Sequence, residues 1–190
     1  INPDAENDSD LFGTLKKRDI LLHHPFQTFK TVIDFIRNAA EDPDVVVIKQ
    51  TIYRAGMTSE LMEALISAAN KGKEVIVIVE LKARFEEQNI DWAQQLEQAG
   101  AQVVYGVMGL KTHAKLALVI RRENGIFRYY CHLGTGNYHP TTTKFYTDFG
   151  LLTAHPQITS EVNEVFLHLT SLTKPKKLDY LWLAPFTLHR

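Results

Sequence analysis

Residues 111–120 read Lys-Thr-His-Ala-Lys-Leu-Ala-Leu-Val-Ile. The apolar run that starts at Leu116 predicts a β-strand. Because alternate side chains of a strand point to the same face, a strand that already begins at residue 111 would align Lys111, His113 and Lys115 in one row. An imidazole between two ammonium groups suits a site that binds a polyanion and attacks it. The lysines supply positive charge, and the histidine supplies a nucleophile or a general acid or base.

A second motif, Gly134-Thr135-Gly136-Asn137, follows a strand-like run over residues 127–133. Two glycines allow the backbone to turn sharply or to approach a ligand closely. The Asn137 side chain is then placed to orient a neighbouring histidine. A lone His-x-Lys is common by chance, but the two motifs on adjacent strands together indicate a site around His113.

The segments that precede these motifs alternate between strands and helices. Runs of Val and Ile predict strands buried on both faces, and helical periodicity lies between them, which gives a βαβαβ order. That order implies a parallel sheet with right-handed crossovers. The turn Glu123-Asn124-Gly125 predicts a hairpin added to this sheet. The predicted fold class is α/β, with a mixed, mostly parallel sheet and helices on both faces; its strands lie around residues 45–48, 75–79, 103–105, 114–121, 126–133 and 150–153.

Two arginines occupy matching positions after the first two of these strands. Arg54 comes nine residues after Val45, and Arg84 comes nine residues after Val75. Both therefore fall just past the carboxyl end of a parallel strand, at the edge where open α/β sheets bind ligands. Guanidinium groups bind phosphate oxygens in bidentate pairs, which predicts a phosphate site; the alternative is that both are solvated loop charges. Sequence alone leaves open whether the hairpin brings His113 to the same edge.

The composition places limits on the partners of the chain. Its 190 residues are 45% hydrophobic and 23% charged, which is ordinary for a soluble globular domain. A net charge of -1 gives no bulk electrostatic reason to bind nucleic acid or a membrane, so a polyanion site must arise from local clustering. The single cysteine, Cys131, excludes an internal disulfide and fits a reducing compartment. No apolar stretch is long enough to predict a transmembrane segment.

Three regions are predicted along the chain. Residues 1–18 are polar and rich in turn formers, which predicts a linker or an arm from a preceding domain. Residues 19–173 form the main domain, and residues 174–190 are interpreted as a connection toward a following domain. The first residue is Ile and not Met, which favours a piece of a longer protein.

His113-x-Lys115 followed by Gly134-Thr135-Gly136-Asn137 resembles the signature of the phospholipase D superfamily, His-x-Lys and then Gly-x-x-Asn. One element departs, because that superfamily usually has Asp five residues after the Lys, where this chain has Ile120. The sequence around both motifs is similar, more specifically, to that of the type 1 polyphosphate kinases. The similarity runs from about residue 19 to near the C-terminus and includes Ile52-Tyr53-Arg54, Glu80-Leu81-Lys82-Ala83-Arg84-Phe85 and Tyr146-Thr147-Asp148.

This resemblance implies a phospholipase D-like fold and the first carboxyl-terminal catalytic domain of a kinase. The implied reaction is the reversible transfer of the terminal phosphate of ATP to inorganic polyphosphate. His113 carries over as the histidine that becomes phosphorylated, and Lys115 and Asn137 hold the imidazole or the phosphate in place. The residue that matches Tyr146 contacts the nucleotide, and Lys111 is expected to bind phosphate.

The resemblance also implies Mg²⁺ as cofactor. Positions that match Arg54 and Arg84 belong to the magnesium and phosphate site of the family. A guanidinium has no lone pair to give a metal, so we expect both to bind phosphate oxygens that Mg²⁺ also touches. The implied partners are ATP, ADP, inorganic polyphosphate, the other domains of the parent chain and further copies of the full-length protein. The implied location is the cytoplasm, or the inner face of the membrane as a peripheral protein.

Two other functions compete with the kinase. A phosphodiesterase of the phospholipase D type would use the same histidine on a diester, with a second His-x-Lys as acid. The chain holds one copy, and Ile120 and the longer spacing before Gly134 count against this reading. A non-catalytic polyanion-binding module would use the cationic side chains for binding only. Glu80 and Asp148 are further candidates to steer a proton or a metal.

Overall fold

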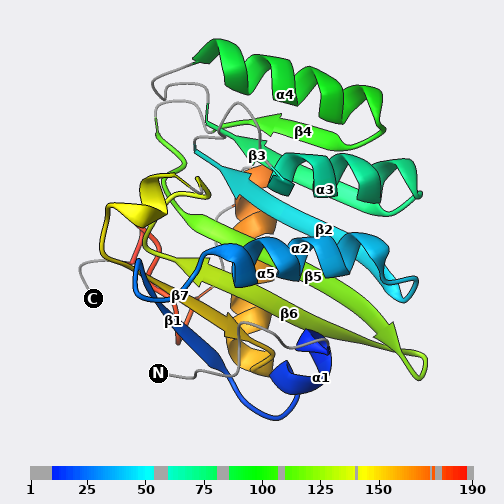
Figure 1. The fold of residues 1–190 in the computed structure, drawn as a ribbon, viewed down its shortest axis with the longest axis vertical. Coiled ribbons are helices and arrows are strands. Elements are labelled where there is room, and N and C mark those ends of the chain that lie inside the picture. Colours follow the sequence, from blue (N-terminus) through cyan, green and yellow to red (C-terminus); the bar gives the residue numbers. More distant parts are fainter. Residues whose placement is uncertain are drawn as a thin grey trace.

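The computed structural model describes residues 10–53, 60–80, 86–106, 110–139, 141–171, 173 and 177–187, with only the backbone for 86–89. In this part of the chain the strands form one seven-stranded sheet, ordered β1-β7-β6-β5-β2-β3-β4 (Figure 1). The strands are β1 Ile20–His24, β2 Val45–Ile52, β3 Glu74–Val79, β4 Gln102–Tyr105, β5 Lys115–Glu123, β6 Ile126–Gly134 and β7 Asp148–Thr153. The helices are α1 Leu11–Leu15, α2 Lys30–Glu41, α3 Glu60–Asn70, α4 Glu86–Gln98, α5 Pro156–Ser171 and the 3₁₀ helix η2 Thr142–Lys144.

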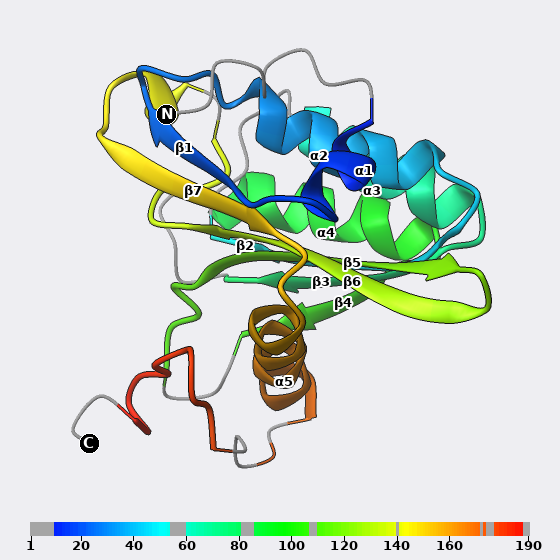
Figure 2. The same ribbon diagram turned by 90° about the horizontal axis from the view of Figure 1, so that it is seen from below.

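Helices cover both faces of the sheet, as the sequence predicted. Figure 2 shows α1 to α4 on one face and α5 crossing the other. The larger apolar cluster joins the sheet to α2 and α3, and includes Phe35, Leu65 and Tyr130. A second cluster joins the opposite face to α5 through Val162 and Phe166. Within the described residues, no helix combines the length and apolar character needed to cross a bilayer.

The βαβαβ prediction is confirmed, but the sheet is less parallel than expected. β2 pairs with β3 and β3 with β4, both parallel. The other four neighbouring pairs are antiparallel. The physical reason is that the β5–β6 hairpin joins the sheet beside β2, and β7 and β1 then extend it on the far side of the hairpin. Local sequence pattern carries no signal for which existing strand a hairpin will join.

The hairpin itself has the turn that its sequence predicts. β5 and β6 pair antiparallel from Lys115 opposite Gly134 to Glu123 opposite Ile126. Asn124 and Gly125 form the two-residue loop, with φ values of 50° and 79°. Positive φ at both loop positions is the type I′ geometry that matches strand twist, and Asn-Gly adopts it readily.

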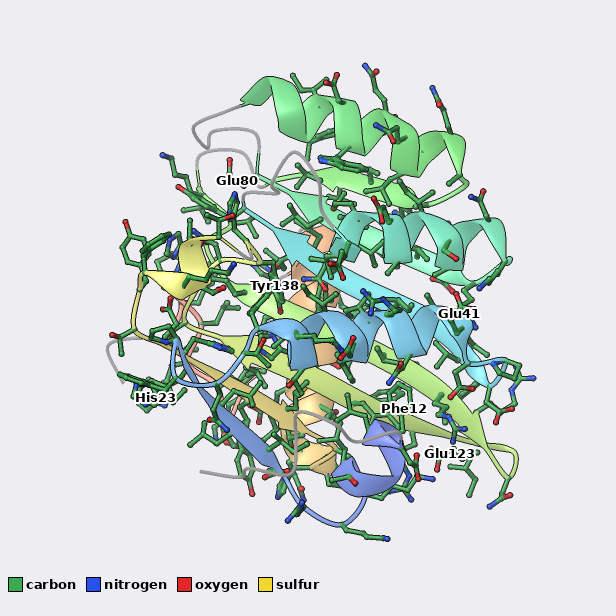
Figure 3. All side chains as sticks on the ribbon, in the orientation of Figure 1. Phe12, His23, Glu41, Glu80, Glu123 and Tyr138 are labelled. Atoms are coloured by element: carbon green, nitrogen blue, oxygen red, sulfur yellow. The ribbon has the colours of Figure 1, made fainter. Side chains whose placement is uncertain are left out.

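The predicted linker over residues 1–18 is wrong for part of its length. Residues 11–15 form helix α1, and Leu11, Phe12 and Leu15 are buried. The ring of Phe12, which is labelled in Figure 3, packs edge to face with the ring of Tyr130, with centroids 4.9 Å apart. Three apolar residues within five positions are too few to show helical periodicity, so packing against the sheet supplies the order that the sequence did not reveal.

Residues 177–187 lie on the side of the sheet that α5 covers (Figure 2). The Glu161 carboxylate on α5 accepts hydrogen bonds from the backbone N–H groups of Asp179, Tyr180 and Leu181. Leu178 is buried in the α5 cluster. That residues 174–190 connect this domain to a following one stays a prediction.

Candidate functional site

The segment that carries His113 is not a strand. β5 begins at Lys115, and residues 111–114 precede it without strand pairing. Thr112 and Lys115 are buried, whereas Lys111 and His113 are exposed. The prediction that Lys111, His113 and Lys115 form one row along a strand is therefore wrong. The cause is that this backbone bonds to side chains of β2 and of the residue after β3, and not to a neighbouring strand.

Two polar side chains hold this segment at the carboxyl edge of the parallel strands. Glu80 directly follows β3 (Figure 3), and its carboxylate accepts the backbone N–H of Thr112 at 2.7 Å. Thr51, near the end of β2, donates its hydroxyl to the carbonyl oxygen of Ala114 at 2.7 Å and accepts the N–H of Leu116 at 2.9 Å. The hairpin thus brings His113 to the edge where open α/β sheets bind ligands.

Tyr53 and Lys115 are neighbours of His113 at this edge of the sheet. The rings of Tyr53 and His113 meet edge to face, with centroids 5.1 Å apart and planes at 77°. The Lys115 Nζ lies 5.2 Å from the centroid of the Tyr53 ring. The same ammonium donates a hydrogen bond to the carbonyl oxygen of His113. The imidazole and the cation are therefore fixed against one aromatic ring.

The electrostatics of this pair favour a neutral imidazole beside a cation. Although His113 is exposed overall, the partial covering of its ring lowers its pKa below the ordinary 6.5, and the neighbouring Lys115 ammonium lowers it further. Burial lowers the pKa of Lys115 to about 8, and the Asp148 carboxylate partly opposes this shift. Near neutral pH, the imidazole keeps a free lone pair while an ammonium stands next to it.

The Gly-Thr-Gly-Asn loop folds onto Asp148. The Thr135 hydroxyl donates to the Asp148 carboxylate at 2.8 Å and accepts the backbone N–H of Phe149 at 2.9 Å. A Cβ on Gly136 would lie 2.4 Å from the same carboxylate, so this approach requires glycine. Asn137 is half-buried, and among the described residues its side-chain oxygen has no hydrogen-bond partner and makes no hydrogen bond to His113. Its predicted role in holding the imidazole or the phosphate stays a prediction.

A buried polar chain lies beneath this loop. The Tyr138 hydroxyl lies 2.7 Å from Nδ1 of His132, and Tyr138 is labelled in Figure 3. Nδ1 of His24 donates to the carbonyl oxygen of Gln27 at 2.8 Å, because a carbonyl only accepts. Buried polar side chains from β6 and β1 therefore lie under the motif loop.

The two histidines of this chain converge over Gly150. A Cβ on Gly150 would lie 2.7 Å from Nε2 of His132 and 3.5 Å from Nε2 of His24. Both Nε2 atoms are buried and have no partner among the described residues. Since His24 holds its proton on Nδ1, its Nε2 is an acceptor. If Tyr138 donates to His132, the Nε2 of His132 carries a proton.

The remaining predicted residues are spread more widely. Lys111 and His113 line a cavity of about 490 Å³ whose other wall includes Trp182 and Phe186. Tyr146 is 65% exposed. Arg54 and Arg84 lie outside the described residues. A second cavity, of about 420 Å³, lies between the hairpin and the start of α5 and is lined by none of the predicted site residues.

The described residues do not form a cage for a metal. No group of three or more His, Cys, Asp or Glu side chains among them is arranged to hold an ion. Glu80 and Asp148, the two carboxylates considered from sequence, instead bond to the backbone of Thr112 and the hydroxyl of Thr135. Mg²⁺ therefore stays a prediction, and its expected ligands are phosphate oxygens.

Comparison with known proteins identifies the family. The family model for polyphosphate kinase C-terminal domain 1 matches residues 10–175. The chain belongs to the polyphosphate kinase family. A polyphosphate kinase from Neisseria meningitidis serogroup A is 56% identical over 183 residues, which cover 96% of this chain and 27% of that protein. The chain thus spans about a quarter of the length of the curated relatives that it matches.

Solved structures agree with this assignment. The crystal structure of polyphosphate kinase from Porphyromonas gingivalis matches with a TM-score of 0.80 and 36% identity, over 92% of this chain and 29% of that one. A phospholipase D family member from Salmonella typhimurium matches with a TM-score of 0.61 and 11% identity, over 84% of this chain and 98% of that one. The second likeness concerns the fold alone, and it confirms the phospholipase D-like fold of this polyphosphate kinase domain.

Sequence reasoning missed the residues that hold His113. Tyr53 was noted only as part of the resemblance, and Thr51 was not considered. Their signal was available, because both stand at the carboxyl end of β2, next to Arg54. In this polyphosphate kinase domain, Thr51 and Tyr53 at the end of β2 therefore contact the segment that carries His113, beside the position of Arg54.

Proposed function

We propose that this chain is the part of a polyphosphate kinase in which His113 accepts the terminal phosphate of ATP and passes it to inorganic polyphosphate. The observation that carries the proposal is the pairing of an exposed imidazole of lowered pKa with the Lys115 ammonium at the carboxyl edge of β2 and β3. A neutral imidazole is a nucleophile, and a nearby cation stabilises charge on a transferring phosphoryl group.

The proposed transfer has two steps. A ring nitrogen of His113 attacks the terminal phosphorus with its lone pair, and the bond from that phosphorus to the bridging oxygen breaks, so ADP leaves with the electron pair. In the second step a terminal oxygen of the polyphosphate chain attacks the same phosphorus. The N–P bond breaks, its electron pair returns to the imidazole, and the chain is one phosphate longer. The reverse sequence makes ATP from ADP.

The other predicted residues serve positioning in this proposal. Lys115 neutralises charge on the transferring group, and Lys111 on the cavity rim attracts the polyanion. Arg54 and Arg84 bind phosphate oxygens, with Mg²⁺ on the same phosphates. Tyr146 contacts the nucleotide, and its high exposure leaves it accessible. Other domains of the longer protein complete the site, and self-assembly and a cytoplasmic location remain part of the same proposal.

The proposal is tested by labelling the whole protein with ATP that carries radioactive terminal phosphate. The expected result is protein-bound label that is stable to base and labile to acid, located on the peptide that contains His113. Label on another residue, or no label under conditions that give polyphosphate synthesis, would refute the phosphohistidine mechanism. Hydrolysis of a phosphodiester without any polyphosphate synthesis would favour the phosphodiesterase, and polyphosphate binding without chemistry would favour the binding module.

The rate of labelling is expected to fall above about pH 8. Lys115 has its pKa lowered to about 8, so its positive charge is present below that pH and is lost as the pH rises through it. In Lys115→Arg the guanidinium stays charged to beyond about pH 12, so the alkaline limb should move upward even where the maximal rate is lower. Labelling rates measured from pH 6 to 10 check this. Identical alkaline limbs in both proteins would show that another group titrates.

A further inference from the structure

Tyr53 is the residue whose ring touches both members of the His-x-Lys motif. It directly follows β2 and is half-buried. Among the described residues, it supplies the ring that packs against the His113 imidazole, with centroids 5.1 Å apart. The Lys115 Nζ lies 5.2 Å from the centroid of the same ring. One aromatic side chain therefore contacts the proposed nucleophile and its neighbouring cation together.

The contact with His113 bears on geometry. An edge-to-face ring pair has a preferred orientation, which restricts rotation of the imidazole about its Cβ–Cγ bond. Such a rotation changes which ring nitrogen faces the substrate, because Nδ1 and Nε2 lie on different edges of the ring. Attack on phosphorus requires the reacting atoms to be about 3–3.5 Å apart and aligned. A ring that fixes the imidazole plane thereby sets the direction of attack.

The contact with Lys115 bears on charge. A cation over an aromatic face is attracted by the ring quadrupole, and here the same ammonium also donates to the His113 carbonyl oxygen. These two contacts keep the positive charge beside the imidazole. Burial lowers the pKa of His113, this charge lowers it further, and both favour the neutral ring. Removing the aromatic face would release the ammonium and admit water to the imidazole.

We infer that Tyr53 is a positioning residue for the phosphoryl transfer, and that it holds His113 and Lys115 in the attacking arrangement through its aromatic ring. This inference rests on the proposed function, because it assigns Tyr53 a role in the phosphorylation of His113. Both contacts that carry it are made by the ring face and edge, so the ring rather than the hydroxyl performs the role.

The test compares the whole protein with its Tyr53→Phe and Tyr53→Leu variants. Phenylalanine keeps the ring, and its labelling rate from ATP should stay within about threefold of the wild type. Leucine keeps much of the apolar volume without a π face, so we expect kcat to fall about 10- to 100-fold with little change in KM for ATP. The acidic limb of its pH profile should also move up toward pH 6.5, as the pKa of His113 returns toward its ordinary value.

A matched control is Tyr129→Leu, which removes a tyrosine from β6 beside the cavity that lacks predicted site residues, and it should behave as the wild type. Wild-type rate and pH profile in Tyr53→Leu would overturn the inference and leave the proposed function standing. A phenylalanine variant as slow as the leucine variant would also overturn it, since the role would then belong to the hydroxyl. Absence of acid-labile label in the wild type would remove the proposed function and the inference together. Tyr53→Met provides the same comparison if the leucine variant does not fold.

Discussion

Replacing His113 with glutamine should lower the rate of polyphosphate synthesis from ATP by at least about 10⁴-fold. The amide of glutamine has a similar reach but no nucleophilic nitrogen. The N–P bond therefore cannot form, and the second step, which breaks that bond, cannot take place. The acid-labile label should disappear at the same time. Because His113 is exposed and its side chain carries no core packing, the free energy of unfolding should change by less than about 1 kcal/mol. Activity and label are measured on the same preparation, beside a thermal unfolding curve.

The matched control for this variant is His155→Gln. His155 precedes α5, and its ring packs on that of Tyr180 with centroids 5.5 Å apart. Neither residue contacts His113 or lines the cavity beside it. It should keep wild-type activity and label. Substantial synthesis by His113→Gln would contradict the phosphohistidine mechanism. A loss of polyphosphate binding in that variant, with binding measured separately from synthesis, would point instead to a role of the imidazole in holding the polyanion.

The protein should lose stability as the pH falls below about 6.5, because of a histidine that lies under the motif loop. His132 is 2% exposed, and burial lowers its pKa to about 3, with His24 adding to the shift. An unfolded chain binds this proton near pH 6.5, so the native state is favoured above that pH and the advantage is lost between about 6.5 and 3. The whole effect is on the order of 5 kcal/mol, with a slope of about 1.4 kcal/mol per pH unit inside the window.

Urea unfolding measured at intervals from pH 7 to 5 would test this slope. The window excludes most carboxylate titration, which matters because Glu123, held by Lys16, Tyr130 and Arg121, has its pKa lowered to about 2 and contributes only at more acidic pH. His132→Gln removes the titrating ring, so its slope between pH 6.5 and 5 should be flatter even though the variant is less stable overall. Equal slopes in the two proteins would show that His132 does not couple protonation to folding.

The hairpin turn, the two buried parallel strands and the two site motifs could be predicted from local sequence. Asn124-Gly125 predicts a two-residue hairpin loop wherever it stands between two strands, because both positions tolerate positive φ. The valine-rich runs at β2 and β3 predict buried strands for a similar reason, since few other environments cover both faces of such a segment. The combination of His-x-Lys with the Gly-Thr-Gly-Asn loop could also be predicted from the sequence, because it depends on residue identity and spacing.

Tertiary packing decided the features that no local pattern contains. Helix α1 is ordered because Phe12 meets Phe35 and Tyr130, which come from α2 and β6. The prediction that Lys111, His113 and Lys115 form one row along a strand was wrong. Glu80 and Thr51, which are distant in sequence, hydrogen-bond the backbone that a neighbouring strand would otherwise have bound. Tyr53 contacts His113 because β5 pairs with β2 in the sheet.

The sequence by itself therefore determined the α/β class, the family and the residue proposed to carry the phosphate, because each is written in side-chain type and spacing. Only the tertiary structure decided that the sheet is mainly antiparallel, which residues clamp His113, and which buried groups lie under the motif loop. The hydrogen bonds that hold the His113 segment, for example, join residues 32 and 63 positions apart. Their energies depend on where chain reversal and strand insertion place the partners, and a linear pattern does not encode that placement.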